Sequence, residues 1–205
     1  MQPQYETSRL LLSVSHPDKA AGVLEFYERN RDFLEPYEPV KRPGFYSLDF
    51  QRTNLTFEYN SFVKARHLRM WMYLRDRTNV PIGTICFSNF LHGAFSSCML
   101  GYKTDKDHLQ QGYMTEALSF LIPLVCREYR FHRIEHMSCR TTNRRSHCSR
   151  SSPSIGRGCF MTLRRSTANG KIITYILILH DLPLLFSVLP PPAFLSSASA
   201  DGEAP

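Results

Sequence analysis

The chain has 205 residues, of which 42% are hydrophobic and 21% charged, and its formal net charge is +7. This length suits one domain with a tail, and the composition excludes a collagen, a coiled coil and a wholly disordered chain. No apolar run approaches the ~20 residues that a membrane span needs, so we expect no membrane partner. Residues 1–6 lack the basic and apolar regions of a secretory signal, which predicts a cytoplasmic protein.

Six cysteines are spread over residues 86–159 without a C-x-x-C pair. This spacing disfavours a disulfide scaffold and a zinc site, so we expect reduced, mostly buried thiols and no metal. The mild positive charge suits an anionic ligand. It also admits a nucleic-acid-binding or ribosome-binding module, but no platform of interleaved basic and aromatic residues is recognisable, and we expect no nucleic-acid partner.

The N-terminal third predicts a strand, two helices and a loop between them. Residues 6–12 have the pattern of a strand, and Asp18 is placed to cap a helix over residues 19–30. Residues 33–39 contain two prolines, which break a helix, so a loop is expected there. A second helix is expected over residues 49–66.

The middle of the chain predicts three strands, a helix and a further strand. The strands are expected over residues 68–75, 82–87 and 98–102. Residues 113–129 place apolar side chains at helical spacing, which predicts an amphipathic helix. Residues 133–139 predict the next strand.

A polar segment, residues 105–117 (DKDHLQQGYMTEA), leads from the third of these strands into the helix. The first backbone N–H groups of a helix lack intrahelical partners, and together with the helix dipole they form a site for an anion. Gly112 would let the backbone approach a phosphate closely. A single glycine is equally compatible with an ordinary loop before an amphipathic helix, so this feature alone does not decide the function.

Several motifs occur together, in order, over residues 1–146. They are ETSRLLL at 6–12, FYERNR at 26–31, LEPYEP at 34–39, LGY at 100–102, QQGYMTEAL at 110–118, HRIE at 132–135 and NRRS at 143–146. This set resembles the Gcn5-related N-acetyltransferases (the GNAT superfamily), in the branch of RimJ-like and RimL-like ribosomal-protein-alanine N-acetyltransferases. Leu109 stands where the general motif of the family, Q/R-x-x-G-x-G/A, has Gln or Arg.

The resemblance implies a GNAT acyl-CoA N-acyltransferase fold, an α/β fold with a mixed, mostly antiparallel sheet flanked by helices. It implies transfer of an acetyl group from acetyl-CoA to an amine, by direct attack and without a covalent intermediate. The implied acceptor is the N-terminal amine of a ribosomal protein. A small amine acceptor and a catalytically dead remnant of the family are the alternatives, and the oligomeric state stays open.

The resemblance also implies how acetyl-CoA is bound. Its pyrophosphate would lie on N–H groups of residues 110–115, and its pantetheine arm would pair like an added strand with residues 99–102. The N–H of Met99 or Leu100 would polarise the thioester carbonyl. The implied cofactor-binding residues are Met99, Leu100, Tyr102, Gln110, Gln111, Gly112, Tyr113, Met114, Thr115 and Asn143.

The catalytic base is not identified by the sequence. Glu135 and His136 are candidates, and strand alternation would send only one of them toward the site. Cys98 lies near the expected position of the thioester, but it has no plausible His or Asp partner in the sequence. We therefore do not expect it to act as a nucleophile.

The composition changes after residue 146, since residues 147–205 contain nine Ser and six Pro. Residues 147–167 show neither helical nor strand periodicity, while residues 171–179 could form an opportunistic strand. Reading the possible codons in a shifted frame recovers two later segments of the family at the right spacing. They resemble LLEKLGF, except for its glycine, and INGKWEDH. We interpret residues 147–205 as an aberrant, frameshifted Ser/Pro-rich tail, and residues 1–146 as a GNAT domain that is incomplete at its C-terminus, without the family's fourth helix and last two strands.

Overall fold

The computed structural model describes residues 1–139, 160–166 and 172–179, with side chains as far as His136. The described strands form one sheet in the order β1-β2-β3-β4-β5-β6-β8-β7. Neighbouring strands are antiparallel, except that β5 and β6 run parallel. The strands are β1 (Gln4–Glu6), β2 (Leu10–Ser13), β3 (Leu68–Leu74), β4 (Gly83–Leu91), β5 (Ser97–Thr104), β6 (Arg133–Cys139), β7 (Phe160–Ser166) and β8 (Ile172–Leu179).

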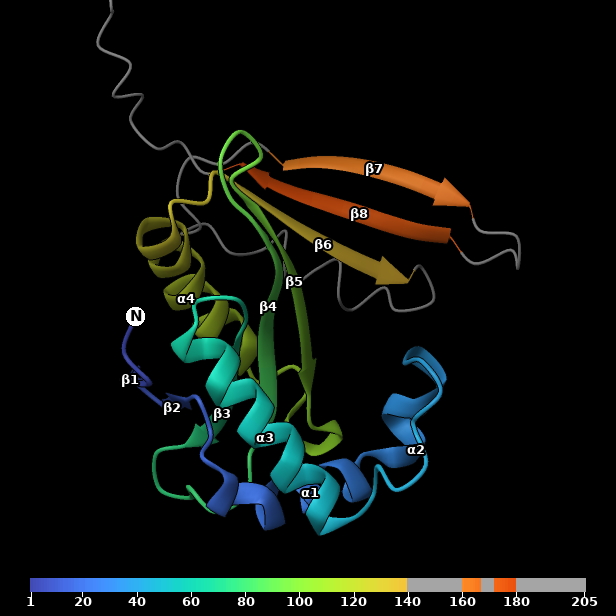
Figure 1. Ribbon diagram of the computed structural model, residues 1–205. Helices are drawn as coiled ribbons and strands as arrows, with labels where there is room; N and C mark the ends of the chain where they lie inside the picture. The colour runs from blue at the N-terminus through green and yellow to red at the C-terminus, as the bar shows by residue number, and fades with distance from the viewer. Residues whose placement is uncertain (140–159, 167–171, 180–205) are drawn as a thin grey trace, which may run out of the picture.

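Helices pack on both faces of this sheet (Figure 1). The α-helices are α1 (Ala20–Arg29), α2 (Arg31–Leu34), α3 (Leu48–Val63) and α4 (Tyr113–Tyr129), and the 3-10 helices are η1 (Pro17–Lys19), η2 (Glu35–Tyr37) and η3 (Lys106–His108). Along β3, Met70 and Met72 belong to the core with α4, whereas Trp71 and Tyr73 belong to the core with α1 and α3. Successive side chains of a strand point to opposite faces, so this central strand contributes to both cores.

The parallel strands β5 and β6 separate partway along their length. Their paired residues run from Ser97 and Arg133 as far as Leu100 and His136. Beyond that point β5 stays paired with β4 up to Thr104, while β6 continues against β8. Figure 1 shows β6 diverging from β5. The divergence leaves the edge of β5 after Leu100 without its parallel neighbour.

The predicted α/β fold with a mixed, mostly antiparallel sheet is confirmed. Helix α4 and strand β6 have the bounds that their apolar patterns predict, 113–129 and 133–139. The other expected strands and helices also form, with ends shifted by a few residues. The largest shift is in β4, which continues to Leu91 through an irregularity after Ser88.

Three expectations for the N-terminal third are wrong in detail. The first strand divides into β1 and β2, because residues 7–9 turn aside to contact α4. Asp18 does not cap α1; it lies within η1, and Lys19 at the N-cap makes no side-chain capping bond. Residues 33–39 are partly helical, because Pro36 lies in the first turn of η2, where the missing N–H of proline costs nothing.

The expectation that residues 147–167 contain no strand is wrong, because β7 forms within them. The expected loss of the family's own fourth helix and last two strands stays a prediction. Strand β8 matches the opportunistic strand expected at 171–179. It pairs with the edge of β6 opposite β5, and β7 then pairs with β8. Unpaired strand edges readily accept another strand, and the Ile-rich sequence of β8 favours it. Asn143, the expected non-helical stretch before Phe160 and the Pro-rich end lie outside the described residues.

Candidate active site

The turn between β5 and α4 has an unusual backbone. Gly112 is the N-cap of α4 with φ 80° and ψ 0°, and Gln110 also has a positive φ of 60°. L-residues avoid this left-handed region, so glycine is the natural residue at position 112. A β-carbon added at Gly112 would lie 3.4 Å from the Arg9 side chain. Because Gly112 carries no side chain, the turn therefore leaves the backbone at the start of α4 uncovered at this position, as a phosphate-binding site requires.

A buried carboxylate holds the β5 end of this turn. Asp105 is fully buried and accepts hydrogen bonds from Arg29 Nε at 2.9 Å and from the Asp107 N–H at 2.9 Å. The Asn30 amide donates to Asp105 and accepts from the Lys106 N–H. Burial alone would raise the pKa of Asp105, but these hydrogen bonds and the Arg29 charge lower it below its ordinary value. The turn is thus tied to α1.

A second carboxylate, Glu116, holds the helix end of the turn. It accepts hydrogen bonds from Thr7 Oγ1 at 2.6 Å, Ser8 Oγ at 3.0 Å, the Arg9 N–H at 2.9 Å and Arg9 Nε at 2.7 Å. Burial alone would raise the pKa of Glu116, but the hydrogen bonds from Thr7 and Arg9 outweigh it and lower the pKa to about 2. Sequence reasoning missed Arg9 and Glu116 as a pair, because more than a hundred residues separate them in the chain.

The predicted residues on β5 lie on two faces of the sheet. Leu100 and Tyr102 point into the core shared with Met114 of α4. Met99 lies on the other face, where its sulfur accepts a hydrogen bond from the Asn89 amide at 2.9 Å. The predicted residues of the turn, 110–115, surround the start of α4. The two groups of predicted residues, those on β5 and those in the turn before α4, are thus connected through Thr104 and Asp105.

The two candidate bases also lie on opposite faces. His136 is 2% exposed, donates from Nδ1 to the Leu100 carbonyl at 2.9 Å and stacks on Tyr102, with ring centroids 4.7 Å apart. Glu135 is half-buried and forms an ion pair with Arg133 at 2.6 Å. Because the Leu100–His136 pair is the last before β5 and β6 diverge, the His136 ring lies at the point of divergence.

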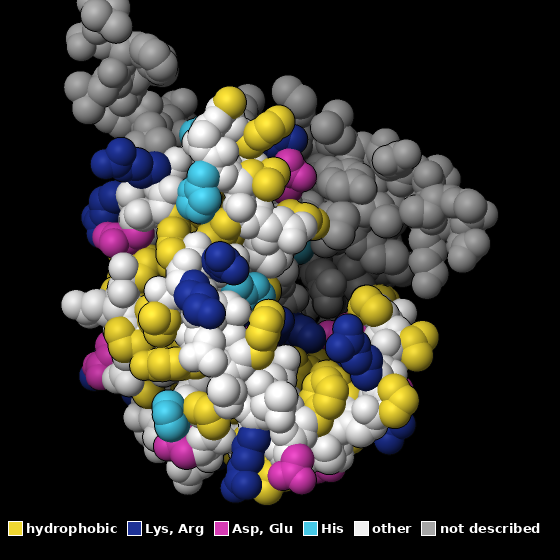
Figure 2. Space-filling model, in the orientation of Figure 1, with side chains coloured by type: hydrophobic (Ala, Val, Ile, Leu, Met, Phe, Trp, Pro, Cys, Tyr) yellow, Lys and Arg dark blue, Asp and Glu magenta, His cyan; other side chains and the backbone are white. Residues whose placement is uncertain are grey.

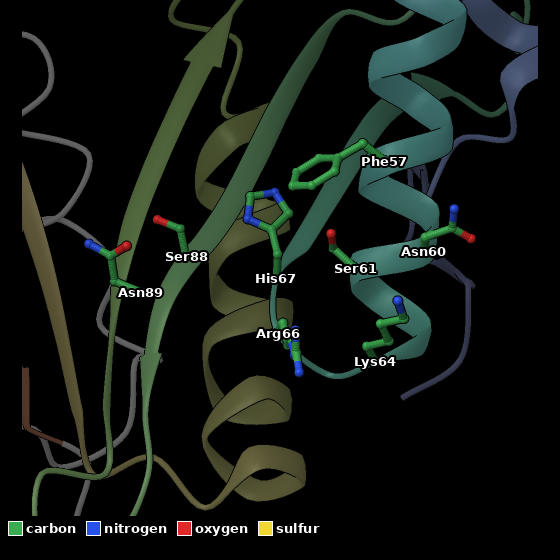
Figure 3. A pocket seen from close by; sticks show the side chains of 8 residues that line it. All are labelled: Phe57, Asn60, Ser61, Lys64, Arg66, His67, Ser88 and Asn89. Carbon is green, nitrogen blue, oxygen red and sulfur yellow. The ribbon is translucent and has the colours of Figure 1, made fainter.

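A cavity of about 480 Å³ lies beside Met99 on the face away from α4. It is lined by Phe57, Asn60, Ser61, Lys64, Arg66, His67, Ser88 and Asn89. Figure 3 shows Phe57 and Ser61 of α3 on one side, and Ser88 and Asn89 of β4 on the other. Burial, and to a lesser extent the Arg69 charge, lowers the pKa of His67 to about 4, so its ring is neutral at neutral pH.

The loop that carries the LEPYEP motif is fixed to β5 on this same face. Glu38 pairs with both Lys103 of β5 and Lys41. Burial alone would raise the pKa of Glu38, but the two lysines lower it. Figure 2 shows that the Lys and Arg side chains of the visible face lie in small separate groups among hydrophobic ones. These ion pairs thus fix the loop on this face of the sheet, beside the point where β5 and β6 diverge.

Other chemistry has little support in the part of the chain that the structure describes. Across residues 1–136, no three His, Cys, Asp or Glu side chains are grouped so that they could hold a metal ion. None of the described helices combines the length and apolar character needed to cross a membrane. Cys98 is buried, and burial raises the pKa of its thiol well above the usual range, which disfavours a thiolate nucleophile there.

Comparison with known families agrees with this geometry. Residues 9–148 match the family described as acetyltransferase (GNAT) domain. The match covers more than half of the chain, and the chain belongs to this family.

Two curated relatives share part of the sequence. The chain is 32% identical over 130 residues to the [ribosomal protein uS5]-alanine N-acetyltransferase of Escherichia coli, which is 62% of this chain and 66% of the relative. It is 28% identical over 124 residues to the probable N-acetyltransferase YjcK of Bacillus subtilis, which is 60% of this chain and 66% of the relative. The matched segments thus span slightly less than two thirds of each relative.

Solved structures share the fold at lower identity. The ribosomal-protein-S5-alanine acetyltransferase of Vibrio fischeri superposes with a TM-score of 0.75 at 18% identity, covering 86% of this chain and 95% of that one. RimL, a ribosomal L7/L12 alpha-N-protein acetyltransferase solved with coenzyme A, superposes with a TM-score of 0.70 at 14% identity, covering 85% of this chain and 96% of that one.

Proposed function

We propose that this chain is built to transfer an acetyl group from acetyl-CoA to a primary amine, and that the acceptor is the N-terminal amine of a protein of the ribosomal class. One observation carries the proposal: parallel strands diverge directly beside a helix whose start is capped by a left-handed glycine. The curated relative from Escherichia coli is named as an alanine N-acetyltransferase of ribosomal protein uS5, and RimL, a ribosomal L7/L12 alpha-N-protein acetyltransferase, was solved with coenzyme A.

The residues present suit the proposed co-substrate. The open backbone at Gly112 and the first N–H groups of α4 would hold the pyrophosphate in residues 110–115. Within residues 99–102, the edge of β5 loses its pairing with β6 after Leu100, and the pantetheine arm would bind there. Acetyl-CoA supplies an acetyl group activated as a thioester, and an N–H near Met99 or Leu100 would stabilise the negative charge that develops on its oxygen.

The two candidate bases take different roles in this proposal. His136 is occupied by the Leu100 carbonyl and Tyr102, so we assign it the role of a positioning residue at the point of divergence. Glu135 lies on the other face, paired in register with Met99, and is the better candidate to accept a proton from the acceptor amine. The amine would approach on the face that carries the Glu38 loop and the cavity beside Met99.

The proposed domain boundary falls near residue 146, and the family match ends at residue 148. We therefore keep the frameshift interpretation. Under it, the alternative to an active acetyltransferase is that this chain is a catalytically dead remnant of the family. Strands β7 and β8 would then be formed by replacement sequence, added to the edge of β6.

A transfer assay tests the proposal. The 205-residue chain and a version with the shifted frame restored after residue 146 are each incubated with acetyl-CoA and a peptide that begins with a free N-terminal alanine. We expect mass spectrometry to show a single acetyl group on the N-terminus with the restored version. The matched control is the same peptide with a blocked N-terminus and a free lysine. Acetylation of the blocked peptide or of a diamine, but not of the free N-terminus, would contradict the proposed acceptor.

A further inference from the structure

The phosphate cradle of this chain lacks one side chain that its family motif provides. Leu109 occupies the position where the motif has Gln or Arg, and its side chain has no hydrogen-bond donor. The backbone of residues 110–115 would then face two negatively charged phosphates without that donor. A cation from another part of the chain would restore the missing contact.

Arg9, from the link between β1 and β2, lies against this turn. Its Nη1 donates to the Gln111 carbonyl at 3.0 Å, and its guanidinium lies 4.5 Å from the centroid of the Tyr113 ring. Its Nη2 is 3.4 Å from the position that a β-carbon on Gly112 would take. The guanidinium therefore borders three consecutive residues of the cradle, Gln111 to Tyr113.

The guanidinium keeps donors for a ligand. Of its five N–H donors, Nε is directed to Glu116 and Nη1 to the Gln111 carbonyl. Nη2 is the nitrogen closest to Gly112, and the side chain is 47% exposed. A guanidinium binds phosphate oxygens through parallel N–H groups, so this edge suits an anion resting on the backbone of Gly112.

Glu116 sets the position of Arg9. Its carboxylate binds both the Arg9 backbone N–H and the Arg9 Nε, and the Thr7 and Ser8 hydroxyls add two further hydrogen bonds. Because Glu116 belongs to the first turn of α4, it moves with the cradle. Arg9 is thereby held in register with the N–H groups of the same helix.

We propose that Arg9 binds the pyrophosphate of CoA, in place of the side chain that Leu109 lacks, and that Glu116 is its positioning residue. The inference rests on the proposed function, since it assumes that the turn binds CoA. It assigns to the link between β1 and β2 a direct part in co-substrate binding.

Calorimetric titration of the full chain tests the assignment with three ligands: CoA, dephospho-CoA, which keeps the pyrophosphate but lacks the 3′-phosphate, and pantetheine, which lacks all phosphates. We expect Arg9→Gln to weaken CoA and dephospho-CoA equally, by about 10-fold or 1.4 kcal/mol, and to leave pantetheine unchanged. Arg31→Gln is the matched control, because Arg31 also pairs with a carboxylate, Glu35, and stacks on an aromatic ring, Tyr46. It should change none of the three affinities.

The outcomes separate the inference from the function on which it rests. Unchanged CoA affinity in Arg9→Gln overturns the assignment, as does an equal loss for pantetheine, which would show a purely structural role. A loss for CoA but not for dephospho-CoA would place Arg9 on the 3′-phosphate and overturn the pyrophosphate contact. If the unaltered chain binds none of the three ligands, the proposed function itself fails.

A double-mutant cycle tests the role of Glu116. We expect Glu116→Gln to weaken CoA binding by itself, and the Arg9→Gln, Glu116→Gln double variant to bind no more weakly than Arg9→Gln alone. Additive losses would overturn the positioning role. Thermal unfolding of each variant shows whether it is folded at the temperature of titration.

Discussion

Replacement of Gly112 probes the phosphate cradle with two variants of nearly equal shape. Gly112→Asp adds a carboxylate and Gly112→Asn adds the neutral amide of the same size. Both residues tolerate the left-handed region better than other side chains, so backbone strain at φ 80° should be similar in the two. The difference between the variants therefore isolates the effect of charge.

The structure indicates the size of that effect. The added β-carbon would lie 3.4 Å from Arg9 Nη2, so the new carboxylate would pair with the guanidinium and occupy the place proposed for the pyrophosphate. We expect CoA affinity to fall by at least ~10-fold, about 1.4 kcal/mol, in Gly112→Asp relative to Gly112→Asn. The Asn variant should itself bind CoA more weakly than the unaltered chain, because its side chain covers the bare backbone.

Calorimetric titration of both variants with CoA and with pantetheine measures this difference. Pantetheine binding should be the same in the two variants, since it carries no phosphate to be repelled. Equal CoA affinities in Gly112→Asp and Gly112→Asn would refute the placement of a phosphate at this turn.

Three further predictions follow from the carboxylates that hold the turn and from the tail. Asp105→Asn should lower the free energy of unfolding in urea by about 2 kcal/mol. This loss is below the usual cost of breaking a fully buried ion pair, because Arg29 is partly exposed. An unchanged unfolding midpoint would contradict the buried network. Glu116 has a folded pKa of about 2 against an ordinary value of 4.5. Its stabilising contribution is therefore complete above pH 4.5 and is lost as the pH falls toward 2. In urea titrations across this range, the free energy of unfolding should decline less steeply in Glu116→Gln than in the unaltered chain. The chain with its present residues 147–205 should show little or no acetyl transfer beside the version with the restored frame, and equal turnover would refute the frameshift interpretation.

Local patterns were enough to predict the elements that frame the site. The apolar spacing over residues 113–129 specifies α4, and the polar segment contains, at position 112, the glycine that the left-handed cap requires. The contacts that hold this cradle were not predictable in the same way. Glu116 meets residues 7–9 only after the sheet has brought β2 beside α4, and Asp105 meets Arg29 from a different helix.

The error at β7 has a related cause. Strand formation there depends on the edge of β6 opposite β5, which pairs with β8 over residues 133–139, and not on the periodicity of residues 160–166 alone. The capping error at Asp18 is smaller and local, since Pro17 begins a 3-10 turn that displaces the start of α1. Sequence patterns therefore indicated which elements form, while long-range pairing decided how the site and the sheet edge are completed.

A crystal structure of the chain with acetyl-CoA would test the central claim most directly. The account predicts the pyrophosphate on the N–H groups of residues 110–115 beside Arg9, and the pantetheine arm along residues 99–102 between the diverging strands β5 and β6. Acetyl-CoA bound away from the start of α4, or β5 and β6 closed against each other along their full length in the complex, would contradict it.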